Sequence, residues 1–169
     1  MRRWDCLLLL LTLSGTPVLA GEPAPEAEAV TGRPEVLAGD LIEVEGLRFR
    51  LYAIDAPEPG QRCLLSLLRK LYDCGEVARS ALLDLTAGTP VTCAPLPDLG
   101  LEVARCQAAG YDLSEGMVYT GWAPADRGVS ERYLPFERQA KARNHGLWRG
   151  RFVAPWDWRR GRRLPEETP

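Results

Sequence analysis

Residues 47–58 of this chain read Leu-Arg-Phe-Arg-Leu-Tyr-Ala-Ile-Asp-Ala-Pro-Glu. Apolar side chains alternate at positions 47, 49, 51 and 53, which is typical of a half-buried β-strand. Residues 36–45 form another apolar-patterned stretch, and the dipeptide Glu45-Gly46 between the two indicates a turn. We therefore predict a β-hairpin over residues 36–54, with Asp55 and Glu58 directly after its second strand.

Three carboxylates and one guanidinium are expected to converge at one end of this hairpin. Asp40 falls at a position that the apolar alternation would bury, and buried carboxylates are rarely left unpaired. Arg50 lies on the strand that leads to Asp55 and Glu58. Hard oxygen ligands of this kind suit Ca²⁺ or Mg²⁺, and an arginine beside a cation can hold a phosphate. An Arg–carboxylate network that only ties a loop to a barrel explains the same pattern equally well.

The rest of the chain predicts an α+β domain built on a small barrel. An apolar stripe indicates a helix over residues 75–87, and two further helices are expected over 113–120 and 130–144, the last with Ser130 as its N-cap. Residues 89–94 and 101–107 have the pattern of short strands. Strands that come early, with helices between and after them, favour this fold class.

The N-terminus predicts export to the periplasm or secretion. Arg2-Arg3, the apolar run 7–13 and Ala20 form the charged, apolar and small-residue regions of a signal peptide, so we expect cleavage after Ala20. A membrane anchor is the alternative, but the run is shorter than the ~20 residues that span a bilayer. We expect no membrane span after cleavage. Residues 21–34, rich in Pro, Ala and Glu, are expected to form a solvated linker ahead of a domain that starts near Glu35.

The net charge of the chain excludes one class of nucleic-acid-binding protein. The chain has 21 Lys and Arg against 23 Asp and Glu, a net charge of −2 that becomes −3 once Arg2, Arg3 and Asp5 leave with the signal. A globally basic nucleic-acid-binding protein is therefore excluded.

The cysteines that remain after residue 20 suggest two disulfides, because their number is even and the chain is expected to be exported. They are Cys63, Cys74, Cys93 and Cys106. Spacing favours the pairs Cys63–Cys74 and Cys93–Cys106 among the three possible pairings, since each closes a short loop. A zinc site is the alternative, and a single histidine, His145, without closely spaced cysteines argues against it.

The order and spacing of these motifs resemble the staphylococcal nuclease-like family (thermonuclease, TNase-like), in particular its exported bacterial members. The resemblance covers roughly residues 35–148 and implies an OB-fold five-stranded barrel packed with about three helices. It also implies Ca²⁺-dependent hydrolysis of DNA or RNA phosphodiesters. The residues that carry it are Asp40, Arg50-Leu51, Ile54-Asp55-Ala56-Pro57-Glu58, Cys74-Gly75 with Ala78, Gly110, Gly121 and Gly146-Leu147-Trp148.

Carried over residue by residue, the resemblance implies a metal site and two catalytic side chains. Asp40 and Asp55 would hold Ca²⁺, with help from the backbone carbonyl of Ala56. Glu58 would orient or deprotonate the attacking water, and Arg50 would bind the phosphate.

Three positions depart from the family pattern and suggest a degenerate site. The family motif Asp-Gly-Asp-Thr is Ala38-Gly39-Asp40-Leu41 here, so one carboxylate and one hydroxyl are lost. Leu101 stands where the family has its second phosphate-binding arginine. Comparable arginines contribute on the order of 10³–10⁵ in rate, so we expect hydrolysis to be weak or lost.

Arg105 and Arg127 are the two candidates to replace this missing arginine. Arg105 shares the strand face of Leu101 but lies about 13 Å further along, too far to replace it. Arg127, in the loop before the last helix, is the better candidate.

Two further segments allow two interpretations each. Residues 64–72 are strongly apolar and are expected to form a short helix packed on the barrel, with a partner-binding surface as the alternative. Residues 149–169 form an Arg/Trp-rich tail. We expect its tryptophans to pin it to the barrel while its arginines keep it soluble; a strip that contacts phosphates and stacks on bases is the alternative.

Two functions follow from this pattern. The first is an exported, monomeric nuclease-fold protein with a partial Ca²⁺ site, weak nucleic-acid binding and weak or lost hydrolysis. The second is a non-catalytic binding or scaffold module for a protein or polyanion partner in the cell envelope.

Overall fold

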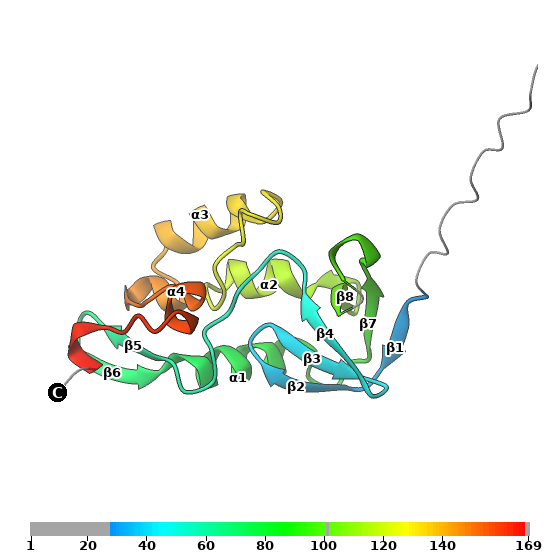
Figure 1. Ribbon diagram of the computed structural model, residues 1–169, viewed down its shortest axis with the longest axis horizontal. Coiled ribbons are helices and arrows are strands. Elements are labelled where there is room, and N and C mark those ends of the chain that lie inside the picture. The colour runs from blue at the N-terminus through cyan, green and yellow to red at the C-terminus, as the bar shows by residue number, and fades with distance from the viewer. Residues whose placement is uncertain (1–27, 101, 168–169) are drawn as a thin grey trace, which may run out of the picture.

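A computed structural model describes residues 28–100 and 102–167 of the chain. The expected signal peptide, the first half of the expected linker (residues 21–27) and Leu101 lie outside these residues. The described part confirms the predicted α+β class: a mixed seven-stranded sheet and a three-stranded sheet are packed with helices (Figure 1). Figure 1 shows β5 and β6 at the opposite end of the molecule from β1 and β7.

The large sheet has the strand order β1–β7–β8–β4–β3–β2, with β9 paired to β8. Its neighbouring strands are antiparallel except for β4 and β8, which are parallel. Among the described strands no pairing closes this path into a ring. The strands are β1 (Val30–Gly32), β2 (Pro34–Ala38), β3 (Leu41–Val44), β4 (Leu47–Leu51), β7 (Val91–Pro95), β8 (Val103–Ala108) and β9 (Tyr111–Asp112).

The N-terminal part of the sheet differs from the prediction in two ways. The strand expected over 36–45 is divided into β2 and β3 by a turn at Gly39-Asp40. The sheet also begins at Val30, inside the expected linker, because β1 pairs with β7 and the Thr31 and Thr92 hydroxyls are hydrogen-bonded at 2.8 Å. Backbone pairing holds β1 together with the packing of a single apolar side chain, Val30, against the core, so the composition of this segment does not reveal the strand.

Two of the three predicted helices begin at aspartate caps. The Asp73 carboxylate accepts a hydrogen bond from the Glu76 N–H at 2.9 Å, and the Asp112 carboxylate accepts one from the Ser114 N–H at 2.9 Å. Among the described residues no helix is long and apolar enough to cross a membrane. The helices are α1 (Cys74–Thr86), α2 (Leu113–Tyr119), α3 (Leu134–Ala142) and α4 (Pro155–Arg159), with 3₁₀ turns at Pro97–Leu99, Gly146–Arg149 and Pro165–Glu167.

The third predicted helix starts later than expected. Ser130 is not its N-cap: its hydroxyl accepts a hydrogen bond from the Arg132 N–H at 3.1 Å within the preceding loop. Helix α3 begins at Leu134, and Pro135 lies in its first turn, where a missing N–H is tolerated.

The short helix predicted over residues 64–72 is wrong. Strands β5 (Arg62–Leu65) and β6 (Lys70–Asp73) form an antiparallel hairpin there, with Leu64 opposite Leu71. The Cys63–Cys74 disulfide joins the two ends of the hairpin. Leu67 and Leu68, at its tip, are 93% and 66% exposed, so the apolar residues do not share one buried helical face.

The C-terminal segment 149–167 is part of the fold rather than a detached tail. Strand β10 (Gly150–Arg151) pairs with β5 and completes the small sheet β10–β5–β6. Trp148 packs edge-on against Phe152, while Trp156 on α4 is 38% exposed. The segment is therefore held by strand pairing as well as by side-chain packing, and the tryptophan spacing indicated only the second of these.

Both predicted disulfides are present. Cys93 and Cys106 face each other across β7 and β8, and both are completely buried in the main core. The core around them contains Ile42, Val44, Phe49, Leu82, Met117 and Tyr133.

We expect the double substitution Cys93→Ala/Cys106→Ala to lower the free energy of unfolding by about 3 kcal/mol, because the open chain gains conformational freedom when unfolded. Urea titration followed by circular dichroism measures the change. Wild-type protein in excess reductant is the control and should lose at least as much stability. An unchanged unfolding midpoint in the double variant would contradict this assignment.

Candidate functional site

The loop that follows β4 is held on two sides. The Tyr52 N–H donates to the Ala104 carbonyl of β8 at 3.0 Å, and the Asp55 N–H donates to the Pro124 carbonyl at 3.1 Å. The Asp126 N–H donates back to the Ala53 carbonyl at 2.9 Å. These bonds aim residues 53–56 at a cavity of about 420 Å³ between β4, β8 and the loop before α3.

This cavity brings together three of the four predicted site side chains. Asp40, Arg50 and Asp55 line it, together with Asp126 and Arg159, which the sequence did not suggest. Glu58 does not line the cavity but contacts Arg159, which does.

Asp40 is buried by a tight turn. A Cβ on Gly39 would lie 2.8 Å from the Cβ atoms of Ala56 and Ala78, so only glycine lets the turn pack this closely. Asp40 is 7% exposed, and its carboxylate accepts a hydrogen bond from the Ala56 N–H at 3.1 Å. Burial raises the pKa of Asp40 to about 6, although the Ala56 hydrogen bond acts in the opposite direction.

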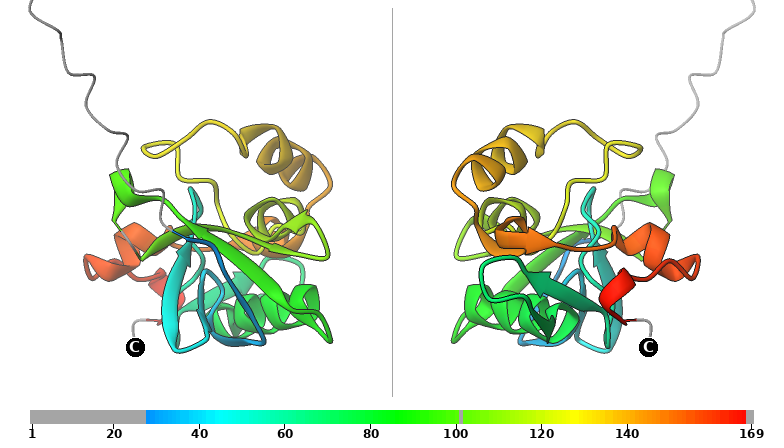
Figure 2. Two further views of the ribbon diagram at one scale, coloured as in Figure 1. Left: turned by 90° about the vertical axis from the view of Figure 1, so that its right-hand side faces the viewer. Right: turned by 90° about the vertical axis from the view of Figure 1, so that its left-hand side faces the viewer.

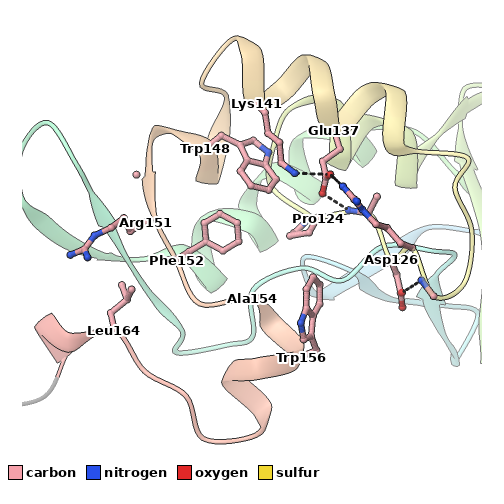
Figure 3. A pocket seen from close by; sticks show the side chains of 14 residues that line it. Pro124, Asp126, Glu137, Lys141, Trp148, Arg151, Phe152, Ala154, Trp156 and Leu164 are labelled. Carbon is pink, nitrogen blue, oxygen red and sulfur yellow. Dashed lines mark hydrogen bonds and ion pairs between the residues drawn. The ribbon is translucent and has the colours of Figure 1, made fainter.

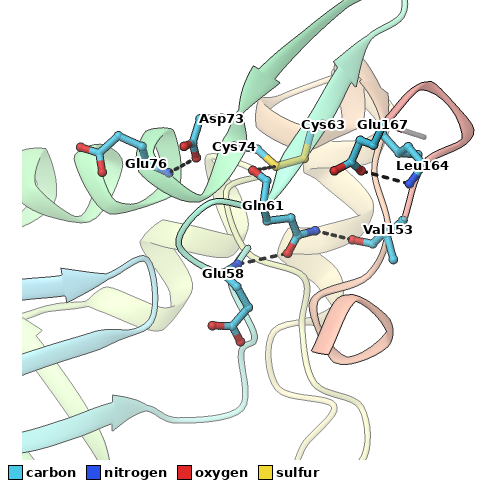
Figure 4. Close-up of a disulfide and its surroundings, with 9 residues drawn as sticks. All are labelled: Glu58, Gln61, Cys63, Asp73, Cys74, Glu76, Val153, Leu164 and Glu167. Atoms are coloured by element: carbon cyan, nitrogen blue, oxygen red, sulfur yellow. Dashed lines mark hydrogen bonds between the residues drawn. A yellow bond between two sulfur atoms is a disulfide. The ribbon is translucent and has the colours of Figure 1, made fainter. Parts of the chain in front are cut away.

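Glu58 is positioned by a completely buried glutamine (Figure 4). The Gln61 amide oxygen accepts from the Glu58 N–H at 3.1 Å, and the Gln61 amide nitrogen donates to the Val153 carbonyl at 2.7 Å. Gly75, at the start of α1, approaches the Glu58 carbonyl so closely that a Cβ would overlap it. The Glu58 loop is therefore fixed to both α1 and the C-terminal segment.

The side chain that dominates the site is Arg159, the last residue of α4. Its two terminal nitrogens donate to the two carboxylate oxygens of Asp55 at 2.8 and 2.6 Å. One of them also pairs with the Glu58 carboxylate. These carboxylates, Asp55 first, raise the pKa of the Arg159 guanidinium, so it stays charged. Only its place in an arginine-rich segment could have marked this residue in the sequence.

The residues of this site do not fit a Ca²⁺ ion in the arrangement that the structure has. Ca²⁺ takes about six to eight oxygen ligands. Here both oxygens of Asp55 are bound to Arg159, and Glu58 is paired with the same guanidinium. Within residues 28–100 and 102–167, no three His, Cys, Asp or Glu side chains form a group that could hold a metal ion.

The positions that depart from the family motif flank the Asp40 turn. Ala38 ends β2 and Leu41 begins β3, and neither side chain offers an oxygen to an ion or to water. Leu101 lies outside the described residues.

Neither Arg105 nor Arg127, the two candidates to replace the missing phosphate-binding arginine, lines the 420 Å³ cavity. Arg127 pairs with the buried Glu137 carboxylate at 3.2 Å and does not line this cavity. Arg105 stacks over the Tyr52 ring, 4.7 Å from its centroid. Local spacing could not find Arg159 because it reaches Asp55 from the far end of the chain.

A second cavity of about 880 Å³ is bordered by the loop before α3 and by the C-terminal segment (Figure 3). Its wall includes Trp148, Phe152 and Trp156, and Lys141 pairs with Glu137 at 2.8 Å at one end. Asp126 lines both cavities. The larger cavity is thus formed mainly by the C-terminal segment and the loop before α3.

Comparison with known proteins places the chain in a family. It is 34% identical over 138 residues to the "Succinoglycan biosynthesis protein ExoI" of Rhizobium meliloti (strain 1021), a match that covers 78% of this chain and 71% of the Rhizobium protein. It is 34% and 33% identical over 129 residues to the "Probable staphylococcal-like nuclease" CAN3 and CAN2 of Oryza sativa subsp. japonica. The chain belongs to the staphylococcal nuclease-like family.

The matches to the two rice proteins cover different shares of this chain and of those proteins. The match to the two rice proteins covers 73% of this chain but only 31% and 32% of their lengths, so the chain corresponds to about a third of each. No family model matches the chain. Membership in the staphylococcal nuclease-like family agrees with the α+β fold and with the cavity that gathers Asp40, Arg50 and Asp55.

We expect Gly75→Ala to destabilise the protein by about 1–3 kcal/mol and to displace the Glu58 loop, because the new methyl group overlaps the Glu58 carbonyl. Chemical denaturation measures the stability, and a crystal structure of the variant measures the displacement. Gly116→Ala is the matched control, since its Cβ meets only side-chain atoms of Leu85, the nearest a methyl carbon at 3.0 Å. Equal stability of the two variants would contradict the expectation.

Proposed function

We propose that this protein is an exported member of the staphylococcal nuclease-like family that binds nucleic-acid phosphodiesters in the 420 Å³ cavity and hydrolyses them weakly or not at all. One observation carries the proposal: Arg50, Asp40 and Asp55 line a single cavity, although they come from a strand, a turn and a loop. This combination corresponds to the phosphate- and metal-binding residues that the family resemblance implies.

The residues of the cavity have separate roles in this proposal. Arg50 is exposed on β4 and donates hydrogen bonds to the phosphate oxygens. Glu58 is the carboxylate that would orient a water molecule for attack on phosphorus. Its pairing with Arg159 engages a carboxylate oxygen that would otherwise be available to the water, which supports slow hydrolysis.

The departures in the sequence support the same conclusion. Leu101 supplies no donor where the family has its second arginine, and Ala38 and Leu41 supply no oxygens beside Asp40. Loss of outer ligand partners typically lowers metal affinity or activity about 10–100-fold. Ca²⁺ is therefore proposed as a weak ligand of this protein rather than a resident ion.

Export is supported by the covalent structure. Two disulfides are formed by the cysteines that remain after residue 20, and disulfides persist mainly in oxidising compartments. The signal-like residues 1–20 support the same address.

A second candidate function is a binding module that does not act on nucleic acid. Leu67 and Leu68 are exposed at the tip of the β5–β6 hairpin, where they offer an apolar contact to a protein partner. The Rhizobium relative is named for succinoglycan biosynthesis rather than for nucleic-acid hydrolysis, which also favours this candidate.

We expect Arg50→Gln to weaken binding of a short single-stranded DNA by about tenfold, because a charge-assisted contact to phosphate is lost. Fluorescence anisotropy of a labelled oligonucleotide, at one fixed salt concentration, measures the affinity. Arg48→Gln is the matched control: Arg48 lies on the same strand but pairs with Glu43 at 3.1 Å, outside the cavity. Failure of the wild type to bind DNA or RNA would reject the proposal and favour the binding module.

We expect Leu101→Arg to raise hydrolysis of single-stranded DNA in the presence of Ca²⁺, by up to about 10³-fold if the missing arginine limits the rate. Release of acid-soluble nucleotides, with and without chelator, measures the rate. Combining Leu101→Arg with Glu58→Gln is the control and should remove the gain. No gain in the single variant would show that the lost arginine is not what limits hydrolysis.

A further inference from the structure

We propose that the Arg159 guanidinium is the resident cation of the Asp55–Glu58 carboxylate pair and competes with a divalent metal ion for it. The identity of these carboxylates as metal- and water-binding groups comes from the proposed function, and the role of Arg159 rests on it. The chain itself then supplies the positive charge that the site requires.

Arg159 contacts both carboxylates of the Asp55–Glu58 pair. Both oxygens of Asp55 accept from the two terminal nitrogens of Arg159, at 2.8 and 2.6 Å, and Glu58 accepts from one of the same nitrogens. Such two-pronged, charge-assisted contacts are among the strongest hydrogen bonds in proteins. The side chain of Asp55 is 10% exposed and that of Glu58 is 22% exposed, so solvent screens these contacts only partly.

A divalent ion cannot simply be added to this arrangement. An ion bound to Asp55 would share an oxygen that already accepts from Arg159, and it would also place a second positive charge beside the guanidinium. Metal binding is therefore favoured when Arg159 leaves the pair. The apparent affinity for the metal therefore falls as the fraction of molecules in which Arg159 is paired rises.

The C-terminal segment delivers Arg159 to the site through three separate contacts. Strand β10 pairs with β5, the Val153 carbonyl accepts from the buried Gln61 amide at 2.7 Å, and Pro155 at the start of α4 is fully buried. Gln61 is also the residue that holds the Glu58 N–H. The cation and one of its carboxylates are thus positioned by the same buried side chain.

Neighbouring arginines do not share this role. Arg160 lies next to Arg159 but pairs with Asp157 at 3.7 Å, and its side chain is 76% exposed. Arg162 pairs with the same aspartate at 3.3 Å. Substitution of Arg160 therefore removes one positive charge beside the site without removing this contact, and it is the matched control for substitution of Arg159.

The test is a calorimetric titration of the purified protein with Ca²⁺ alone, for wild type, Arg159→Gln, Arg159→Lys and Arg160→Gln. We expect Arg159→Gln to bind Ca²⁺ at least about tenfold more tightly than wild type, because a competing charge-assisted contact is removed. Arg160→Gln should match wild type. Arg159→Lys should fall between, since lysine keeps the charge but loses the two-pronged geometry.

Equal Ca²⁺ affinity of wild type and Arg159→Gln, or no detectable binding by the Gln variant when thermal unfolding shows that it is folded, would overturn the proposal. If Arg159→Gln is unfolded, Arg159→Lys decides by the same comparison with wild type. Oligonucleotide binding, measured by anisotropy without metal, separates this result from the proposed function. DNA binding that falls in Arg159→Gln without a gain in Ca²⁺ affinity would make Arg159 a phosphate ligand, which also overturns its role as resident cation but leaves the proposed function standing.

Discussion

Strand β4 is hydrogen-bonded along both edges, and the position of the site follows from this constraint. Its antiparallel pairing with β3 puts Leu41 opposite Arg50, so the turn that contains Asp40 lies beside the end of β4. The parallel pairing with β8 puts Arg50 opposite Val103, and the next loop therefore leaves in a defined direction. Residues that are distant in the sequence consequently meet at one cavity.

The charges of that cavity explain why a small fold needs its C-terminal segment. Burial first, and then the negative charges of the nearby Asp55 and Glu58, raise the pKa of Asp40. A cation has to balance them, and the C-terminal segment provides one in Arg159. The hairpin β5–β6 and strand β10 act together here, because pairing between them sets where α4 begins. An apolar insertion and a basic tail that look unrelated in the sequence form one structural unit.

Patterns confined to neighbouring residues were predicted well. The start of α1, the pairing of Cys93 with Cys106 and the β4 strand all depend on residues within a short stretch. Residues 64–72, within the β5–β6 hairpin, were predicted as a short helix because their leucines suit either period. A disulfide across the hairpin and pairing with β10 favour the extended form, and Cys63, Cys74 and β10 all lie outside residues 64–72.

The sequence by itself determined the α+β class, the family and four candidate site residues, Asp40, Arg50, Asp55 and Glu58, because these depend on local periodicity and on a compact motif. Only the tertiary structure decided what neutralises the carboxylates: Arg159 reaches Asp55 across 104 positions of sequence. Local spacing carries no information on such a contact. It results from strand pairing and from one buried amide, that of Gln61, which come together only when the two ends of the domain are packed.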